Sequence, residues 1–108
     1  MQNEIEILIN AINQDYINWW GEKIKQPHVQ EMVKEFQKSV RIDEGSKYLK
    51  IVAQGSVWGF IVKSEKDKLF RKGDILKAAG FNAPARNKAR GNILDGGYKI
   101  RWTGPYYL

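Results

Sequence analysis

The chain has 108 residues, of which 43% are hydrophobic and 12% aromatic, and it contains no cysteine. This length and composition predict one globular domain, and the lack of cysteine excludes disulfides, thiolate nucleophiles and cysteine-based zinc sites. The net charge is +6, but residues 1–46 carry eight acidic and five basic side chains, whereas residues 47–108 carry thirteen basic and four acidic ones. The basic half therefore favours a polyanionic partner.

The acidic half, residues 1–46, reads as a helical hairpin. Apolar side chains recur at helical spacing in residues 3–20, at Ile5, Leu8, Ile9, Ile12, Tyr16, Trp19 and Trp20. Gly21 is a suitable helix end, and Pro27 is a suitable first residue for a second helix running to about Ser39. We expect the two helices to cover one face of a sheet.

From Lys47 onward the apolar pattern alternates as in strands. Residues 47–53 and 57–63 are predicted to pair through a tight turn, and a Gly-Asp turn near Asp74 introduces a further strand. Asp95-Gly96-Gly97 is the strongest hairpin signal, and it predicts pairing of residues 92–94 with residues 98–102. The tail, residues 103–108, is apolar enough to pack back onto the domain.

These elements predict an α+β fold in a single domain over residues 1–108. Two N-terminal helices are expected to pack on a small, strongly curved antiparallel sheet or open β-barrel. The alternative is an independent β-barrel with a loose helical arm.

The sequence offers few candidates for catalysis. His28 is the only histidine, and its place at a helix start is typical of a surface or capping residue. Asp74 and Asp95 adjoin glycines in turns, where aspartate usually bonds the local backbone. No catalytic pair, phosphate loop or metal-ligand spacing is present. The sequence therefore predicts no catalytic residue, no metal and no cofactor.

The basic segment, residues 77–92, is the strongest candidate for binding. It combines cations with small residues, and residues 75–94 contain no acid. If Asn82 opens a helical turn that Gly91 closes, Arg86 and Arg90 lie on one face and can bind adjacent phosphates. Alternatively, the alanines pack on the sheet and the arginines are solvated or paired with acids of the helices. The predicted anion-binding residues are Lys77, Arg86, Lys88 and Arg90, flanked by Arg71, Lys72 and Arg101.

The aromatic residues allow two readings. Trp58 and Phe60 lie two apart on one predicted strand, either in the core or exposed as stacking platforms for bases. Trp19 and Trp20 are adjacent at a helix end, so one ring is expected to be partly exposed as a protein-contact or dimer site. The oligomeric state stays open.

Three segments resemble a pattern found in small, uncharacterised proteins of tailed bacteriophages. They are GSVWGFIVK at residues 55–63, KGDILKAA at residues 72–79 and APARNKARGNI at residues 83–93. The resemblance covers residues 47–108 and leaves the helical half outside. It implies work in an infected bacterium or in the virion, and it assigns no role to any residue.

The sequence as a whole predicts a non-enzymatic protein that binds single-stranded DNA or RNA with weak sequence selectivity. We expect it in the cytoplasm of an infected bacterium, because it has no secretory signal pattern and no membrane-spanning apolar run. The alternative is a phage effector that inhibits a host protein or sequesters a small phosphorylated signal of host defence.

Overall fold

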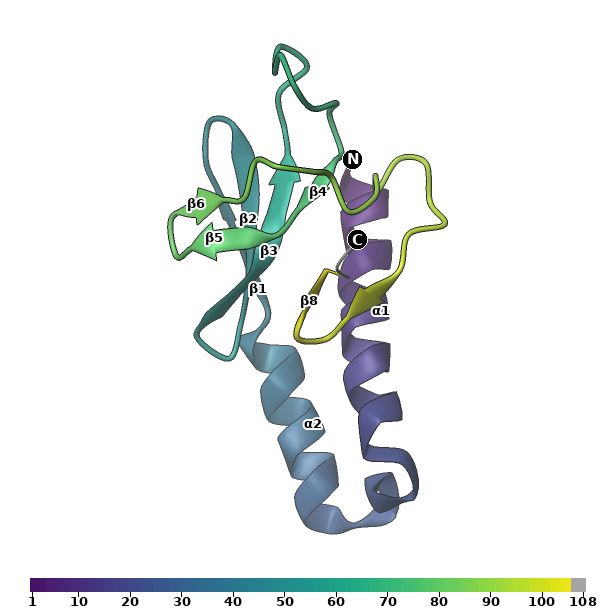
Figure 1. Cartoon of the computed structure of the whole chain (residues 1–108). Coiled ribbons are helices and arrows are strands. Elements are labelled where there is room, and N and C mark those ends of the chain that lie inside the picture. The colour runs from purple at the N-terminus through teal and green to yellow at the C-terminus, as the bar shows by residue number, and fades with distance from the viewer. Residues whose placement is uncertain (106–108) are drawn as a thin grey trace.

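Two helices form the first part of the computed structural model, which describes residues 1–105. Helix α1 (Gln2–Trp20) and helix α2 (Pro27–Ser39) are joined by the 3₁₀-helix η1 (Gly21–Lys25). The predicted helix end is confirmed, because Gly21 has a φ of +58°, a conformation that glycine adopts easily. Figure 1 shows that the turn of this hairpin projects away from the sheet.

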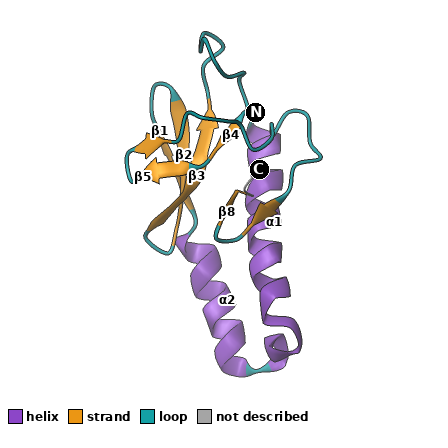
Figure 2. Ribbon diagram, viewed as in Figure 1, coloured by secondary structure: helices purple, strands orange, loops and turns teal. Residues whose placement is uncertain are grey.

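The main sheet has four antiparallel strands in the order β1-β2-β3-β4. These are β1 (Arg41–Glu44), β2 (Tyr48–Ala53), β3 (Ser56–Val62) and β4 (Ile75–Leu76). Strands β2 and β3 agree with the two predicted strands, whereas β1 was not predicted. The sheet is open, so the prediction of helices packed on a small antiparallel sheet is confirmed without closure into a barrel (Figure 2).

The hairpin predicted at the Asp-Gly-Gly turn is wrong. The short C-terminal ribbon instead pairs β7 (Ile100–Arg101) with β8 (Gly104–Pro105). Asn92 forms an isolated bridge with Asp74, and the Ile93 N–H donates to the Gly73 carbonyl at 2.9 Å. The backbone of this segment is therefore already paired with the turn before β4.

The predicted helical turn in the basic segment is also wrong. Strand β6 (Ala83–Pro84) pairs with β5 (Ala78–Gly80). Beyond β6, the Arg90 N–H donates to the Ile75 carbonyl at 2.8 Å. Because these backbone groups bond to neighbouring strands rather than four residues back, Arg86 and Arg90 do not share a helix face.

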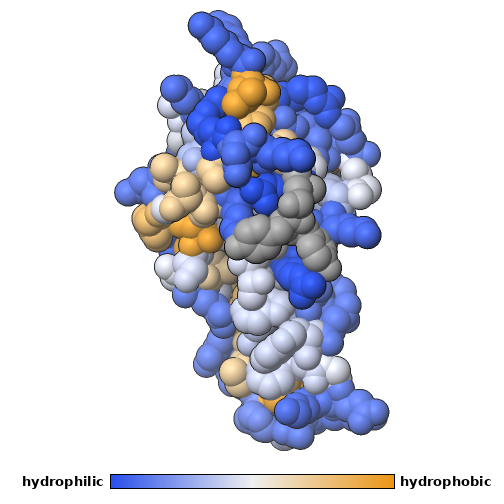
Figure 3. All heavy atoms as spheres, viewed as in Figure 1, coloured by the Kyte–Doolittle hydropathy of each residue, from blue (hydrophilic) through white to orange (hydrophobic). Residues whose placement is uncertain are grey.

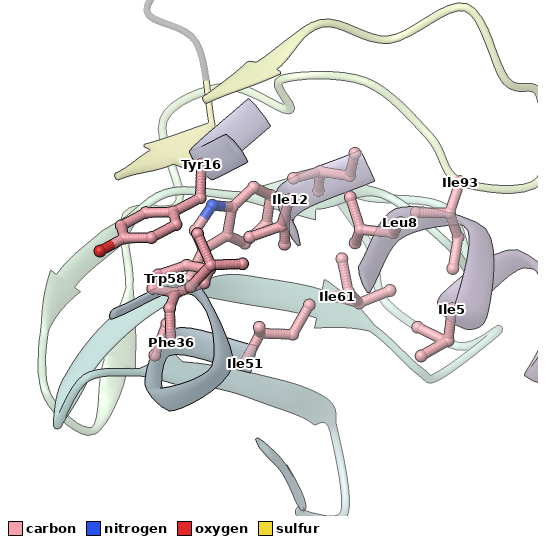
Figure 4. Close-up of a cluster of buried hydrophobic side chains, with 12 residues drawn as sticks. Ile5, Leu8, Ile12, Tyr16, Phe36, Ile51, Trp58, Ile61 and Ile93 are labelled. Atoms are coloured by element: carbon pink, nitrogen blue, oxygen red, sulfur yellow. The ribbon is translucent and has the colours of Figure 1, made fainter. Parts of the chain in front are cut away.

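The helices and the sheet share one apolar core, so the reading of a loose helical arm is wrong. Side chains from α1, α2 and the sheet meet there (Figure 4), among them Leu8, Ile12, Tyr16, Phe36, Ile51, Trp58 and Ile61. No helix among residues 1–105 is long and apolar enough to cross a membrane. The prediction for the tail falls partly outside the described residues, since it includes residues 106–108.

A second apolar cluster lies on the opposite face of the sheet, and it contains Phe60, Val62, Phe70 and Leu76. A bulge in β3 determines which of the two clusters Trp58 joins. Ile51 pairs with Gly59 and Val52 pairs with Val57, so Trp58 is an extra residue and the facing of side chains changes there. Trp58 and Phe60 therefore belong to different clusters, although simple alternation puts them on one face.

Candidate nucleic-acid interface

Trp58 and Phe60 are not stacking platforms. Each is only 3% exposed to solvent, and the Trp58 indole N–H donates to the Arg101 carbonyl at 2.8 Å. Their rings lie within the protein's own packing, so neither ring face is open to a base. The core reading of these two residues is the correct one.

Arg86, the centre of the predicted anion site, is bound by other side chains of the protein. Both of its terminal nitrogens donate to the Asp67 carboxylate at 2.9 Å, and one also donates to the Tyr48 hydroxyl. Its guanidinium carbon lies 5.0 Å from the centre of the Phe70 ring, within cation–π range. We call this arrangement the Asp67–Arg86 clasp; it ties the loop after β3 to the segment after β6.

The clasp keeps both of its partners charged. The hydrogen bonds from Arg86, together with those from backbone N–H groups, hold the pKa of Asp67 well below its ordinary value. In turn, the hydrogen bonds with Asp67 and Tyr48 raise the pKa of Arg86. The reading in which arginines pair with acids is thus correct for Arg86, but the partner lies in the basic half rather than in the helices.

Replacing Asp67 with asparagine is expected to lower the melting temperature by a few degrees at pH 7. The folded-state pKa of Asp67 is lowered, so its contribution is complete above the unfolded pKa and is lost as the pH falls through the folded value. The difference between wild type and Asp67→Asn should therefore shrink as the pH falls below 3.8, the ordinary value for this group. Thermal melts at several pH values measure it.

Asp95→Asn is the matched control. Asp95 pairs with Arg71, and both side chains of that pair are more than half exposed. Exposed ion pairs contribute little to stability, so the control is expected to melt close to wild type at every pH. Equal shifts in the two variants would contradict the special role of the clasp.

The structure does not gather the seven predicted cations into one site. Arg71 pairs with Asp95, and the Lys72 ammonium lies 3.6 Å from the Glu65 carboxylate. Arg101 lines a separate pocket beside α1, together with Trp19. The remaining three also differ in setting: Lys77 and Arg90 have interaction partners of their own, whereas Lys88 is exposed.

A different set of cations lines a pocket of about 460 Å³. It is bounded by Lys47, Tyr48, Ser64, Lys66, Asp67, Lys68 and Arg86. Asp67 is the one carboxylate that the described residues contribute to this lining, and Arg86 already neutralises it. Among residues 1–105 no carboxylate pairs with any of the three lysines, so this lysine pocket carries uncompensated positive charge.

The lysine pocket is built by two loops that are distant in sequence. Lys47 lies in the turn between β1 and β2, and Lys66 and Lys68 lie in the loop after β3, at the end of the domain remote from η1 (Figure 2). The Ser64 hydroxyl accepts a hydrogen bond from the Lys66 N–H at 3.0 Å. The Asp67 carboxylate accepts from the Phe70 N–H, also at 3.0 Å. Such side-chain-to-backbone bonds fix the loop's conformation.

Sequence reasoning missed these lysines because they lie outside the basic segment. Lys66 and Lys68 are two residues apart in a polar loop, a spacing that brings side chains to one side of an extended chain. That signal was available, but nothing local links the loop to Lys47. Arg86 connects the loop to the neighbour of Lys47, because it donates to both the Asp67 carboxylate and the Tyr48 hydroxyl.

The prediction for the paired tryptophans is confirmed as far as exposure is concerned. Trp19 is 62% exposed, and Trp20 is half-buried. The Trp19 ring meets the edge of Trp102, with ring centres 5.6 Å apart, and the Trp102 N–H donates to the Asp15 carboxylate. The end of α1 therefore presents one large aromatic side chain to solvent.

Within residues 1–105, no group of three or more His, Asp or Glu side chains is placed to hold a metal ion. The chain matches the model of a family of unknown function, DUF7717, over residues 1–107. Comparisons with curated proteins and with solved structures found no match. The match takes in the helices and the sheet alike, and the chain therefore belongs to the family of unknown function DUF7717.

Proposed function

We propose that this protein is a non-enzymatic nucleic-acid-binding protein of weak sequence selectivity, and that the lysine pocket binds a backbone phosphate. The observation that carries the proposal is the grouping of Lys47, Lys66 and Lys68 around one pocket in which the Asp67 carboxylate is already neutralised by Arg86. Lysine ammonium groups are strongly hydrated point charges that bind phosphate without reading a base. Binding of this kind is therefore insensitive to sequence.

The charge around the pocket favours a polymer over a single phosphate. Lys47, Lys66 and Lys68 are all exposed, so the pocket presents three cations to solvent. A polyanion that follows several such cations releases several counterions, which makes its affinity strongly dependent on salt. The resemblance to tailed-phage proteins supports action in an infected bacterium, with the virion as the other setting.

The Lys66→Ala/Lys68→Ala double variant tests this proposal. It is expected to bind a labelled single-stranded oligonucleotide roughly tenfold more weakly than wild type at moderate salt. The slope of log affinity against log salt should flatten by about 1.4, since each phosphate contact on a single strand contributes about 0.7. Fluorescence anisotropy with labelled single-stranded DNA, single-stranded RNA and duplex DNA at two or more salt concentrations measures both.

The matched control is Lys34→Ala/Lys38→Ala, which removes two exposed lysines of α2 and changes the net charge equally. This control is expected to keep nearly all of the affinity and the slope. Equal losses in the two double variants would show that the overall field, rather than the pocket, attracts nucleic acid. Wild-type protein that binds no oligonucleotide even at low salt would contradict the proposal, and mononucleotides bound as tightly as oligomers would favour sequestration of a small phosphorylated signal.

The exposed Trp19 favours a second candidate function, binding of a host protein at the end of α1. A large aromatic side chain that is 62% exposed is a common anchor in protein interfaces. A pull-down from nuclease-treated bacterial lysate compares wild type with Trp19→Ala. A stoichiometric protein that wild type retains and the variant loses would support this candidate, and loss of all partners after nuclease would count against it.

A further inference from the structure

Phe81 is an exposed aromatic ring, and the Lys50 ammonium covers one of its faces. It lies at the tip of the β5–β6 ribbon and is 52% exposed; Figure 3 shows apolar surface gathered over this ribbon. The Lys50 ammonium lies 4.1 Å from the centre of its ring and donates to the Asn82 side-chain oxygen at 3.1 Å. The other face of the ring is the one on which a base can stack.

A second pocket of about 360 Å³ lies between this tip and the lysine pocket. Lys47 and Tyr48 line both pockets, so the two adjoin. Asn82, the neighbour of Phe81, lines the second pocket, and the otherwise buried Phe60 contributes an apolar part of its wall. Both volumes fall within or near the range of ligand pockets, about 300–1,000 Å³.

The second pocket differs from the lysine pocket in its polar groups. Asp43 and Glu44 line it, and their carboxylates disfavour a phosphate but accept hydrogen bonds from base amino groups. The Asn82 amide both donates and accepts, as a base edge requires. The two carboxylates are fixed by basic neighbours, Asp43 by Arg41 and Glu44 by Lys63. The chemistry of this pocket therefore suits a nucleobase.

We propose that the second pocket, with Phe81 at its side, binds an unpaired nucleobase while the lysine pocket holds a neighbouring phosphate. This inference rests on the proposed function and adds to it the ligand class, single-stranded nucleic acid. In a duplex each base is stacked and paired, so its face and its edge are unavailable to such a pocket. The protein accordingly binds single strands more tightly than duplexes.

Phe81→Leu separates base stacking from phosphate binding. The variant keeps an apolar side chain but loses the aromatic face, and it is expected to bind single-stranded DNA and RNA at least about fivefold more weakly than wild type. Phe81→Trp is expected to retain the affinity, because it keeps a ring. Trp19→Leu, which alters the exposed aromatic of α1, is the matched control and should bind as wild type does.

Inorganic polyphosphate, which has phosphates and no bases, is the second probe. In competition with labelled oligonucleotide, Phe81→Leu should bind polyphosphate as wild type does, whereas Lys66→Ala/Lys68→Ala should bind it more weakly. Circular dichroism and melting curves establish that each variant is folded. The comparison thus assigns the phosphate and the base to separate side chains.

The outcomes distinguish the inference from the proposed function. If Phe81→Leu keeps full affinity for single strands while the double lysine variant loses it, the base site is wrong and phosphate binding stands. Duplex DNA bound as tightly as single-stranded DNA would likewise overturn the base site. If neither variant changes oligonucleotide binding, both proposals are wrong.

Discussion

Phe36→Ala is expected to lower the free energy of unfolding by about 3–5 kcal/mol, the usual cost of removing a buried phenyl ring. Phe36 is 1% exposed and stacks on Tyr16 with ring centres 4.1 Å apart. It also meets Trp102 edge-on at 5.8 Å. The ring therefore joins α2 to α1 and to the C-terminal ribbon, and its loss leaves a cavity among three elements. Urea denaturation followed by circular dichroism measures the effect.

Two other variants of α2 are the controls for this result. Phe36→Leu fills most of the same volume and is expected to cost less than half as much as the alanine variant. Met32→Ala alters a side chain that is 40% exposed on the same helix, and it should cost less than about 1 kcal/mol. A loss below about 1 kcal/mol for Phe36→Ala would mean that the sheet does not depend on its contact with the helices.

Gly91→Ala is expected to cost about 2–5 kcal/mol, because backbone strain and steric overlap act together. Gly91 has a φ of +145°, and a Cβ atom added there would lie 2.6 Å from the Tyr98 Cβ. The chain cannot easily move away, since the Ile75 N–H donates to the Gly91 carbonyl and the Arg90 N–H donates to the Ile75 carbonyl. The same urea denaturation measures the loss.

Gly96→Ala is the control that introduces backbone strain without steric overlap. Gly96 also has a positive φ, +71°, but no atom lies within 4 Å of an added Cβ. This variant is expected to lose about 1–2 kcal/mol, the cost of a left-handed conformation alone. If Gly91→Ala lowered the free energy of unfolding no more than Gly96→Ala does, Tyr98 would be able to move away from the added Cβ at little cost.

The helical half could be predicted closely because its signals are local. Gly21 and Pro27 mark helix boundaries by their own backbone preferences, and the apolar spacing of α1 identifies the face that is buried. The structural predictions that are wrong concern segments whose hydrogen-bond partners lie far away in the sequence. Asn92 precedes a strong turn signal, and a turn does form there, but the Asn92 side-chain amide donates to the buried Asp74 carboxylate at 2.9 Å. This non-local bond holds Asn92 beside Asp74, and the predicted hairpin does not form.

The sequence indicated that the second half of the chain is strongly basic, but not which cations gather around one pocket. The excess of basic residues favours a polyanionic partner, and such a partner is still a proposal. Arg86 looked available because no acid lies near it in sequence, whereas Asp67 reaches it from 19 positions away. Trp58 and Phe60 face opposite sides of the sheet because β3 contains one extra residue. Strand periodicity cannot reveal such a bulge.

The bulge at Trp58 also determines which side of the sheet receives the largest side chain of β3. Because the extra residue changes the facing of side chains there, Trp58 belongs to the core under the helices and Phe60 to the cluster beside the second pocket. No side chain of α1 or α2 belongs to the Phe60 cluster. A deletion that removed the bulge would turn the Trp58 indole toward the face of Phe60 and out of the core under the helices.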